Sequence, residues 1–184
     1  MTVIRTFRLD QDVDEALKRI SEEDGESVNV IANRTLRKFV EWDRLAQKIG
    51  MMQISRQELV RMMDTLTVDE ARALGSWVGS DTVEPQVRYL NAEINLDTFV
   101  RLVDLLARYS GRFKFDHTVA GGKHVMVIHH SMGPKWSAFY EGAGSKVLGE
   151  LLHIDFVSNV TDELCSFEFT LEGRETSEKR GVPG

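Results

Sequence analysis

The stretch Ile4-Arg5-Thr6-Phe7-Arg8-Leu9 decides the fold of the N-terminal part of the chain. It is short and rich in β-forming residues, and it ends at Asp10, which predicts one strand whose side chains alternate between two faces. A lone strand leaves its backbone N–H and C=O groups without partners, and no nearby segment of this sequence offers a second strand. Pairing with the same strand of a second copy satisfies these groups, so the stretch predicts a two-fold dimer.

Two helices are expected after this strand. The first has apolar residues at helical spacing, namely Val13, Ala16, Leu17 and Ile20. Gly25 ends this helix as a left-handed cap, and Ser27 is a suitable N-cap for the second helix. The apolar stripe of the second helix comprises Val28, Ile31, Ala32, Thr35, Leu36, Phe39 and Val40. Because the stripe continues to Gly50, we expect this helix to extend as a stalk.

A strand, a helix, a turn containing Gly-x-Ser and a second helix resemble the ribbon–helix–helix (MetJ/Arc/CopG-like) family of DNA-binding proteins over about residues 3–46. The resemblance implies a dimer whose two-stranded ribbon lies in the major groove of DNA. Ile4, Thr6 and Arg8 would then face the base edges, with Arg8 able to pair with guanine. The backbone amides of Ser27, Val28 and Asn29, at the start of the second helix, would bind a phosphate.

The charge of the chain limits this interpretation. The whole chain has 23 Lys and Arg against 29 Asp and Glu, which argues against general polyanion binding but allows a small DNA-reading head. Residues 1–50 contain nine basic and ten acidic residues, so this segment has little of the excess positive charge that is usual in a DNA-binding segment. The single cysteine, Cys165, and the lack of a long apolar run favour a cytoplasmic protein that has no membrane contact.

The middle of the chain, residues 51–94, is predicted to be a helical connector. Two capping boxes, Ser55-x-x-Glu58 and Thr67-x-x-Glu70, each open a helix. The turn-rich segment Gly79–Pro85 is the best candidate for a domain boundary. We therefore divide the chain into a DNA-binding domain and stalk at 1–50, this connector, a third domain at 95–172 and a disordered tail at 173–184.

Residues 95–172 show the order helix, two strands, helix, two strands. A helix starts near Asn95 and stops at Gly111, strands flank Gly121-Gly122, and a second helix starts near Pro134. The last two strands form a hairpin around Thr161-Asp162. The pattern predicts an αββαββ domain, with a four-stranded antiparallel sheet that carries its helices on one face, and the fold class of the chain is α+β. This domain would sense a ligand or assemble copies of the chain, as a dimer or a tetramer.

All five histidines lie in this third domain. If Gly121 and Gly122 form a two-residue turn, His117 pairs with Met126, and His117, His124 and His130 share one sheet face. One interpretation is a transition-metal site formed by these three histidines. The other is that they are separate strand-end histidines that bond to backbone or water.

Patterns for catalysis are weak. Asp116-His117 and His153-x-Asp155 supply acid and base types without a recognisable catalytic spacing. Gly142-Ala143-Gly144-Ser145-Lys146 lacks the spacing of a phosphate loop, and close helix packing or a helix break explains its glycines better. We therefore expect no enzymatic activity.

The hypothesis is that the protein is a prokaryotic transcription regulator that binds DNA and is controlled by its third domain. The alternative is a protein-interaction or antitoxin-like module whose head only dimerises or binds a protein.

Overall fold

The computed structural model describes residues 3–89 and 93–171 of the 184-residue chain. The chain forms two compact units, Met1–Arg44 and Leu45–Gly184. The predicted disordered tail at 173–184 lies outside the described residues. None of the described helices is long and apolar enough to cross a membrane.

The N-terminal unit contains the two helices that the sequence predicts. They are α1 (Gln11–Asp24) and α2 (Val28–Lys38). Gly25 ends α1 with a φ of 66°, in the left-handed region. The Ser27 hydroxyl accepts a hydrogen bond from the Val30 amide and caps α2. Both predicted helix boundaries are therefore confirmed.

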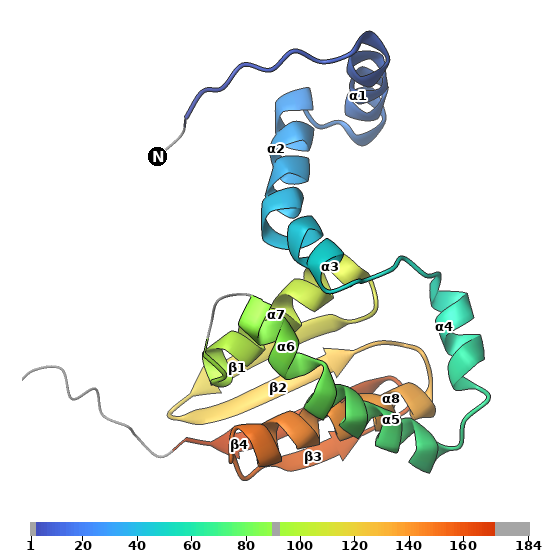
Figure 1. Ribbon diagram of the computed structural model, residues 1–184, viewed down its shortest axis with the longest axis vertical. Helices are drawn as coiled ribbons and strands as arrows, with labels where there is room; N and C mark the ends of the chain where they lie inside the picture. The colour runs from blue at the N-terminus through green and yellow to red at the C-terminus, as the bar shows by residue number, and fades with distance from the viewer. Residues whose placement is uncertain (1–2, 90–92, 172–184) are drawn as a thin grey trace, which may run out of the picture. The chain divides into compact units, whose positions relative to one another are not determined.

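The segment before α1 forms no strand within the described chain. Residues 3–10 are exposed along their whole length and run into α1 without a strand neighbour (Figure 1). Asp10, the residue before α1, has extended backbone angles (φ −68°, ψ 148°). An intermolecular ribbon therefore stays a prediction, and the chain itself offers this segment no strand partner among its described residues.

The second helix continues beyond Lys38, as its apolar stripe indicates. It passes through a π-helical turn, η1 (Phe39–Asp43), into α3 (Arg44–Lys48). In this turn the Arg44 amide donates to the Phe39 carbonyl, five residues earlier, so the helix widens locally. The periodicity of the sequence did not predict the widening.

The C-terminal unit is a mixed helix and sheet structure. Its helices are α4 (Arg56–Met63), α5 (Val68–Asp81), α6 (Val83–Tyr89), α7 (Leu96–Ser110), α8 (Pro134–Ser145) and the π-helical η2 (Lys146–Leu151). Its strands are β1 (Lys114–Ala120), β2 (Lys123–His129), β3 (Val157–Val160) and β4 (Leu164–Thr170). Both predicted capping boxes are present, at the starts of α4 and α5. The order α7, β1, β2, α8, β3, β4 is the predicted αββαββ pattern.

The four strands form one antiparallel sheet in the order β1-β2-β4-β3. The two-residue turn at Gly121-Gly122 pairs Ala120 with Lys123 and His117 with Met126, the register that the sequence predicts. One face of the sheet carries Phe115, Met126, Ile128, Cys165, Phe167 and Phe169, which join the main hydrophobic core. Helices α7 and α8 lie over this face (Figure 1).

Helices α5 and α8 pack unusually closely because glycines face each other's backbone. A Cβ atom added to Gly75 of α5 would lie 1.9 Å from the Phe139 carbonyl oxygen, and one added to Gly142 of α8 would lie 2.2 Å from the Arg72 carbonyl oxygen. Gly79 is buried in the same way, with an added Cβ 2.7 Å from the Ala143 carbonyl oxygen. We call this contact the α5–α8 seam; the close-packing interpretation of the Gly142–Lys146 glycines is confirmed at Gly142.

The seam changes the expected division of the chain. Helix α5, which lies in the expected connector at 51–94, belongs to the same compact unit as the sheet. The candidate domain boundary at Gly79–Pro85 lies inside this unit: Gly79 is within α5 and Pro85 is within α6. The physical reason is that a glycine used for close helix packing looks, in sequence, like a glycine used for a flexible turn.

Candidate ligand pocket

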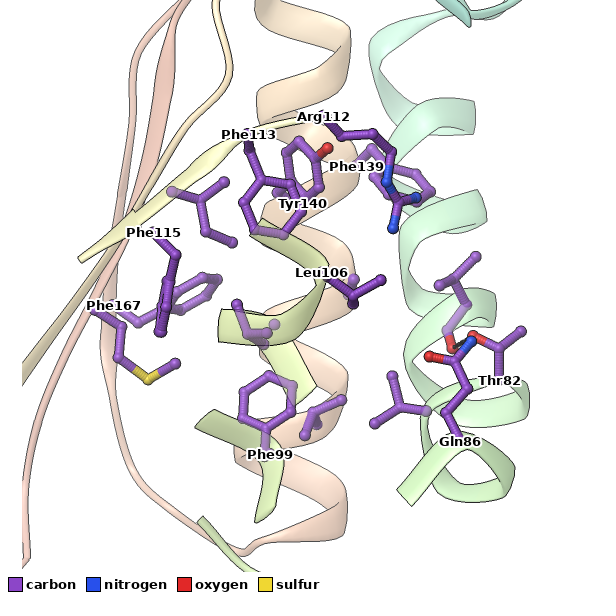
Figure 2. A pocket seen from close by; sticks show the side chains of 18 of the residues that line it. Thr82, Gln86, Phe99, Leu106, Arg112, Phe113, Phe115, Phe139, Tyr140 and Phe167 are labelled. Carbon is purple, nitrogen blue, oxygen red and sulfur yellow. Dashed lines mark hydrogen bonds between the residues drawn. The ribbon is translucent and has the colours of Figure 1, made fainter. Parts of the chain in front are cut away.

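A cavity of about 270 Å³ lies inside the C-terminal unit, between the helices and the core face of the sheet (Figure 2). Its walls come from α5, α6, α7, α8 and strands β1, β2 and β4, with Met51 also contributing. Its volume is near the lower end of the roughly 300–1,000 Å³ that is typical of small-molecule sites. The cavity is therefore large enough to be considered as a binding site.

The lining of the cavity is mostly apolar and aromatic. Five phenylalanines contribute: Phe99, Phe113, Phe115, Phe139 and Phe167. Gly144 makes room for one of them, because a Cβ there would lie 2.2 Å from the Phe167 ring. Such walls favour an apolar ligand, because a polar one would lose its hydration without gaining hydrogen bonds.

The Tyr140 hydroxyl is a polar exception in this lining. Tyr140 is 6% exposed, and its hydroxyl has no hydrogen-bond partner among the described residues. Burial raises the pKa of Tyr140 to about 12, while the positive charges of Arg112 and Arg56 act in the opposite direction. At neutral pH the hydroxyl is therefore a protonated donor without an acceptor, which is costly in a buried position.

Arg112 lines the same cavity and is half-buried. Its Nε lies 3.4 Å from the Ser110 hydroxyl, and it pairs with no carboxylate within the described part of the chain. Arg56, the second cation near Tyr140, donates instead to the Gly111 carbonyl oxygen at 2.9 Å. The end of the cavity near Tyr140 therefore combines an unused O–H donor with an uncompensated positive charge.

The predicted metal-site histidines are only partly brought together. His117 Nε2 and His124 Nδ1 are 3.0 Å apart, and the two rings stack between Phe115 and Phe169. Burial, followed by the neighbouring His124, lowers the pKa of His117. Among the described residues no group of three or more His, Cys, Asp or Glu side chains is placed to hold a metal ion.

His130 shares the predicted sheet face but lies apart from the other two histidines. It follows the end of β2, six residues after His124, which corresponds to roughly 20 Å along a strand. It is 2% exposed, its Nδ1 accepts from the Met132 amide, and its Nε2 lies 2.8 Å from the Ser137 hydroxyl. Its contacts are those of a structural histidine in the core.

The predicted DNA-contact residues fall into two separate groups in the single chain. Ile4, Thr6 and Arg8 are exposed on the segment before α1, with Ile4 90% exposed. Ser27, Val28 and Asn29 form the start of α2, where Ser27 and Asn29 are exposed and Val28 is half-buried. All six remain expectations for a DNA complex.

Tyr140 and Arg112 were not among the site residues predicted from the sequence. Tyr140 lies in α8 among the small and apolar residues Ala138, Phe139 and Gly142, which are all buried. A tyrosine in such a helix is a signal for a buried hydroxyl that needs a partner. Arg112 gives no comparable signal, because an arginine directly after a helix-ending glycine is ordinary at a surface.

Comparison with protein-family models, with curated proteins and with solved structures gives no match for this chain.

Proposed function

We propose that this protein is a transcription regulator that binds DNA as a dimer and responds to a small molecule held in its C-terminal unit. The observation that carries the proposal is that the N-terminal unit has two helices, ended by Gly25 and begun by the Ser27 cap, and an exposed N-terminal segment, yet leaves most of its apolar side chains exposed. A segment of this size buries too little surface to be stable alone and needs a partner.

The exposed apolar side chains occur on the N-terminal segment, on α1 and α2, and in η1. Their exposed fractions run from 39% at Ile20 to 90% at Ile4. The other members are Val3, Phe7, Leu9, Val13, Val30, Leu36, Phe39 and Val40. Along α1, every residue of which is described, none is buried, and along α2 only Ile31 is buried.

A second copy of the same unit is the partner that fits this surface best. The segment 3–10 has unpaired backbone groups as well as exposed apolar side chains, and an identical segment related by a two-fold axis satisfies both. The resemblance to ribbon–helix–helix proteins gives the same arrangement. In that arrangement Phe7 and Leu9 face the helices, and Ile4, Thr6 and Arg8 face outward.

The outward face supplies DNA contacts. Arg8 is exposed and forms no ion pair with the described residues, so its guanidinium is available for the O6 and N7 atoms of guanine. At the start of α2, the Val28 and Asn29 amides belong to the first turn and have no carbonyl partner inside the helix. These amides suit a DNA phosphate.

A second candidate function is a module that binds a protein partner in place of DNA. The composition of α1 favours it, since this helix has six acidic and two basic residues and would be repelled by phosphates. The dimer and the exposed apolar surface are common to both candidates. They differ in whether Arg8 matters for nucleic-acid binding.

The test starts with enrichment of binding sites from a random double-stranded DNA library by the full-length protein. Gel shifts on an enriched site then compare the wild type with Arg8→Ala and with Arg61→Ala, an equal loss of charge on an exposed part of α4. We expect Arg8→Ala to weaken specific binding by about 1–3 kcal/mol per half-site and Arg61→Ala to have little effect. Equal affinities for wild type and Arg8→Ala, or no enriched site, would contradict the DNA proposal and favour the protein-binding candidate.

A further inference from the structure

We propose that the cavity of the C-terminal unit binds a carboxylic acid with an apolar body, whose carboxylate lies between the Tyr140 hydroxyl and the Arg112 guanidinium. The regulatory meaning of this ligand rests on the function proposed above. The binding itself does not, because it is measured without DNA.

The apolar walls define the body of the ligand. Phe99, Val103 and Leu106 contribute from α7, and Met126, Ile128 and Phe167 contribute from the sheet. Figure 2 shows Phe99 and Leu106 in this apolar part of the lining, and the polar side chains of Thr82 and Gln86 in the part formed by the end of α5 and by α6. A sugar, a nucleotide or a peptide would leave its hydroxyl or amide groups without partners along these walls, whereas an alkyl or aryl group loses nothing there.

The unpartnered Tyr140 hydroxyl defines one half of the head-group site. It is a buried donor without an acceptor in the described chain, so a ligand oxygen that accepts its proton removes an existing penalty. Figure 2 shows this hydroxyl at the end of the pocket where the Arg112 side chain enters. The ligand atom expected there is a hydrogen-bond acceptor.

Arg112 defines the charge of that acceptor. Its guanidinium has no carboxylate partner in the described chain, and together with Arg56 it makes the surroundings of the Tyr140 hydroxyl electropositive. An anion is therefore favoured over a neutral carbonyl or an alcohol. A guanidinium also matches the two oxygens of a carboxylate in its geometry.

A monoanion fits better than a phosphate. Arg56 already uses a donor on the Gly111 carbonyl, and Tyr140 offers a single O–H. Among the described residues Arg112 is the only cation in the lining of the cavity, so one positive charge faces the ligand and matches a monoanion better than a dianionic phosphate. Hydrogen bonds from Tyr140 and Arg112 are enough for one carboxylate.

The experiment titrates the full-length protein with hexanoate, octanoate and decanoate, and with the primary alcohols of the same chain lengths, by isothermal calorimetry. We expect the wild type to bind at least one acid, and to bind it about tenfold or more tightly than its matched alcohol, the usual effect of hydrogen bonds to a charged group. Equal binding of acid and alcohol, or no binding across both series, would overturn the proposal.

Variants then test the two head-group residues and the cavity separately. Tyr140→Phe removes only the hydroxyl and Arg112→Gln removes the charge, and each should reduce the preference for acid over alcohol about tenfold. Leu106→Trp fills the cavity and should abolish binding of both series. Matched controls are Tyr89→Phe on α6 and Arg101→Gln on α7, which are exposed and should keep wild-type affinity.

Folding of each variant is checked by its melting temperature without ligand. If a variant does not fold, the acid-to-alcohol ratio of the wild type still decides the proposal. The calorimetry and the gel shifts test separate proposals. If the wild type shows no preference for acid over alcohol, the gel-shift result on Arg8 still stands. If the gel shift fails, the calorimetry result still stands.

Discussion

Gly75 and Phe139 are in such close contact that there is no space for a methyl group between them: a Cβ on Gly75 would lie 1.9 Å from the Phe139 carbonyl oxygen. The obstacle is backbone of α8, which cannot rotate away as a side chain can. The α5–α8 seam thus depends on the absence of a side chain at this position.

The first prediction is that Gly75→Ala destabilises the protein. Alanine has the higher helix propensity by about 1 kcal/mol, but the overlap with α8 costs typically 1–3 kcal/mol and more where backbone must move, so the net effect is a loss. Gly149→Ala is the matched control, because its Cβ would meet only the Phe156 ring at 3.4 Å. Urea unfolding measures both, and an unchanged midpoint for Gly75→Ala would contradict the seam.

The second prediction concerns acid pH and His130. The Met132 amide donates to Nδ1, so in the neutral ring Nε2–H donates to the Ser137 hydroxyl, 2.8 Å away. Burial, followed by the neighbouring His129, lowers the pKa of His130 from 6.5 to about 4. Between these two values the unfolded chain binds the proton and the folded chain does not, so the free energy of unfolding falls as pH falls from 6.5 towards 4.

The full loss attributable to His130 is about 3 kcal/mol, and His117, whose pKa is also lowered, acts in the same direction. NMR titration of the ring protons measures the pKa of His130 directly. His153→Gln, at an exposed histidine, serves as the matched histidine substitution in the unfolding measurements. A His130 that titrates near its ordinary value would refute the prediction.

The third prediction concerns the strand partner of residues 3–10. Proline lacks the backbone N–H that forms hydrogen bonds between strands. In a two-stranded antiparallel ribbon only every second residue forms these hydrogen bonds to the other strand, so only one of two neighbouring residues is sensitive to proline. At least one of Thr6→Pro and Phe7→Pro should therefore convert the dimer to monomer in sedimentation experiments. Gln11→Pro, at the first helical position of α1, introduces the same residue where it is tolerated and serves as the control. Intact dimers for both test variants would rule out the ribbon.

The fourth prediction uses Cys165 as a reporter of unfolding. Its side chain is 0% exposed, and burial raises the pKa of the thiol to about 12, so little thiolate forms and no reagent reaches it. Iodoacetamide should label the native protein only through unfolding, at a rate that rises with urea. A Cys165→Ala variant with Ala73→Cys, an exposed position on α5, should be labelled at once. Rapid labelling of native Cys165 would contradict its burial.

Local patterns predicted much of the fold. The hairpin register followed from Gly121-Gly122, because a two-residue turn leaves only one pairing. The helix starts at Ser55 and Thr67 followed from their capping boxes, whose two hydrogen bonds are both formed within four residues. These features depend only on neighbours in sequence.

The remaining features depend on residues far apart in sequence. Gly79 was assigned to a boundary because its contact, Ala143, lies 64 positions away and leaves no local signal. Tyr140 and Arg112 meet at one end of the cavity only because α8 packs over the start of β1. The three predicted histidines do not form one group because sharing a sheet face does not bring residues together along a strand: His124 lies near the start of β2, and His130 follows its end.

The α5–α8 seam also determines which helix around the cavity a ligand can displace. Glycine-to-carbonyl contacts prevent α5 and α8 from sliding past each other, so these two helices and the sheet beneath them respond to force as one rigid body. Helix α7 faces the cavity through the side chains of Phe99, Val103 and Leu106, which, unlike a backbone carbonyl, can change rotamer. A ligand longer than the cavity would therefore displace α7. The longer the bound molecule, the further this single helix would move.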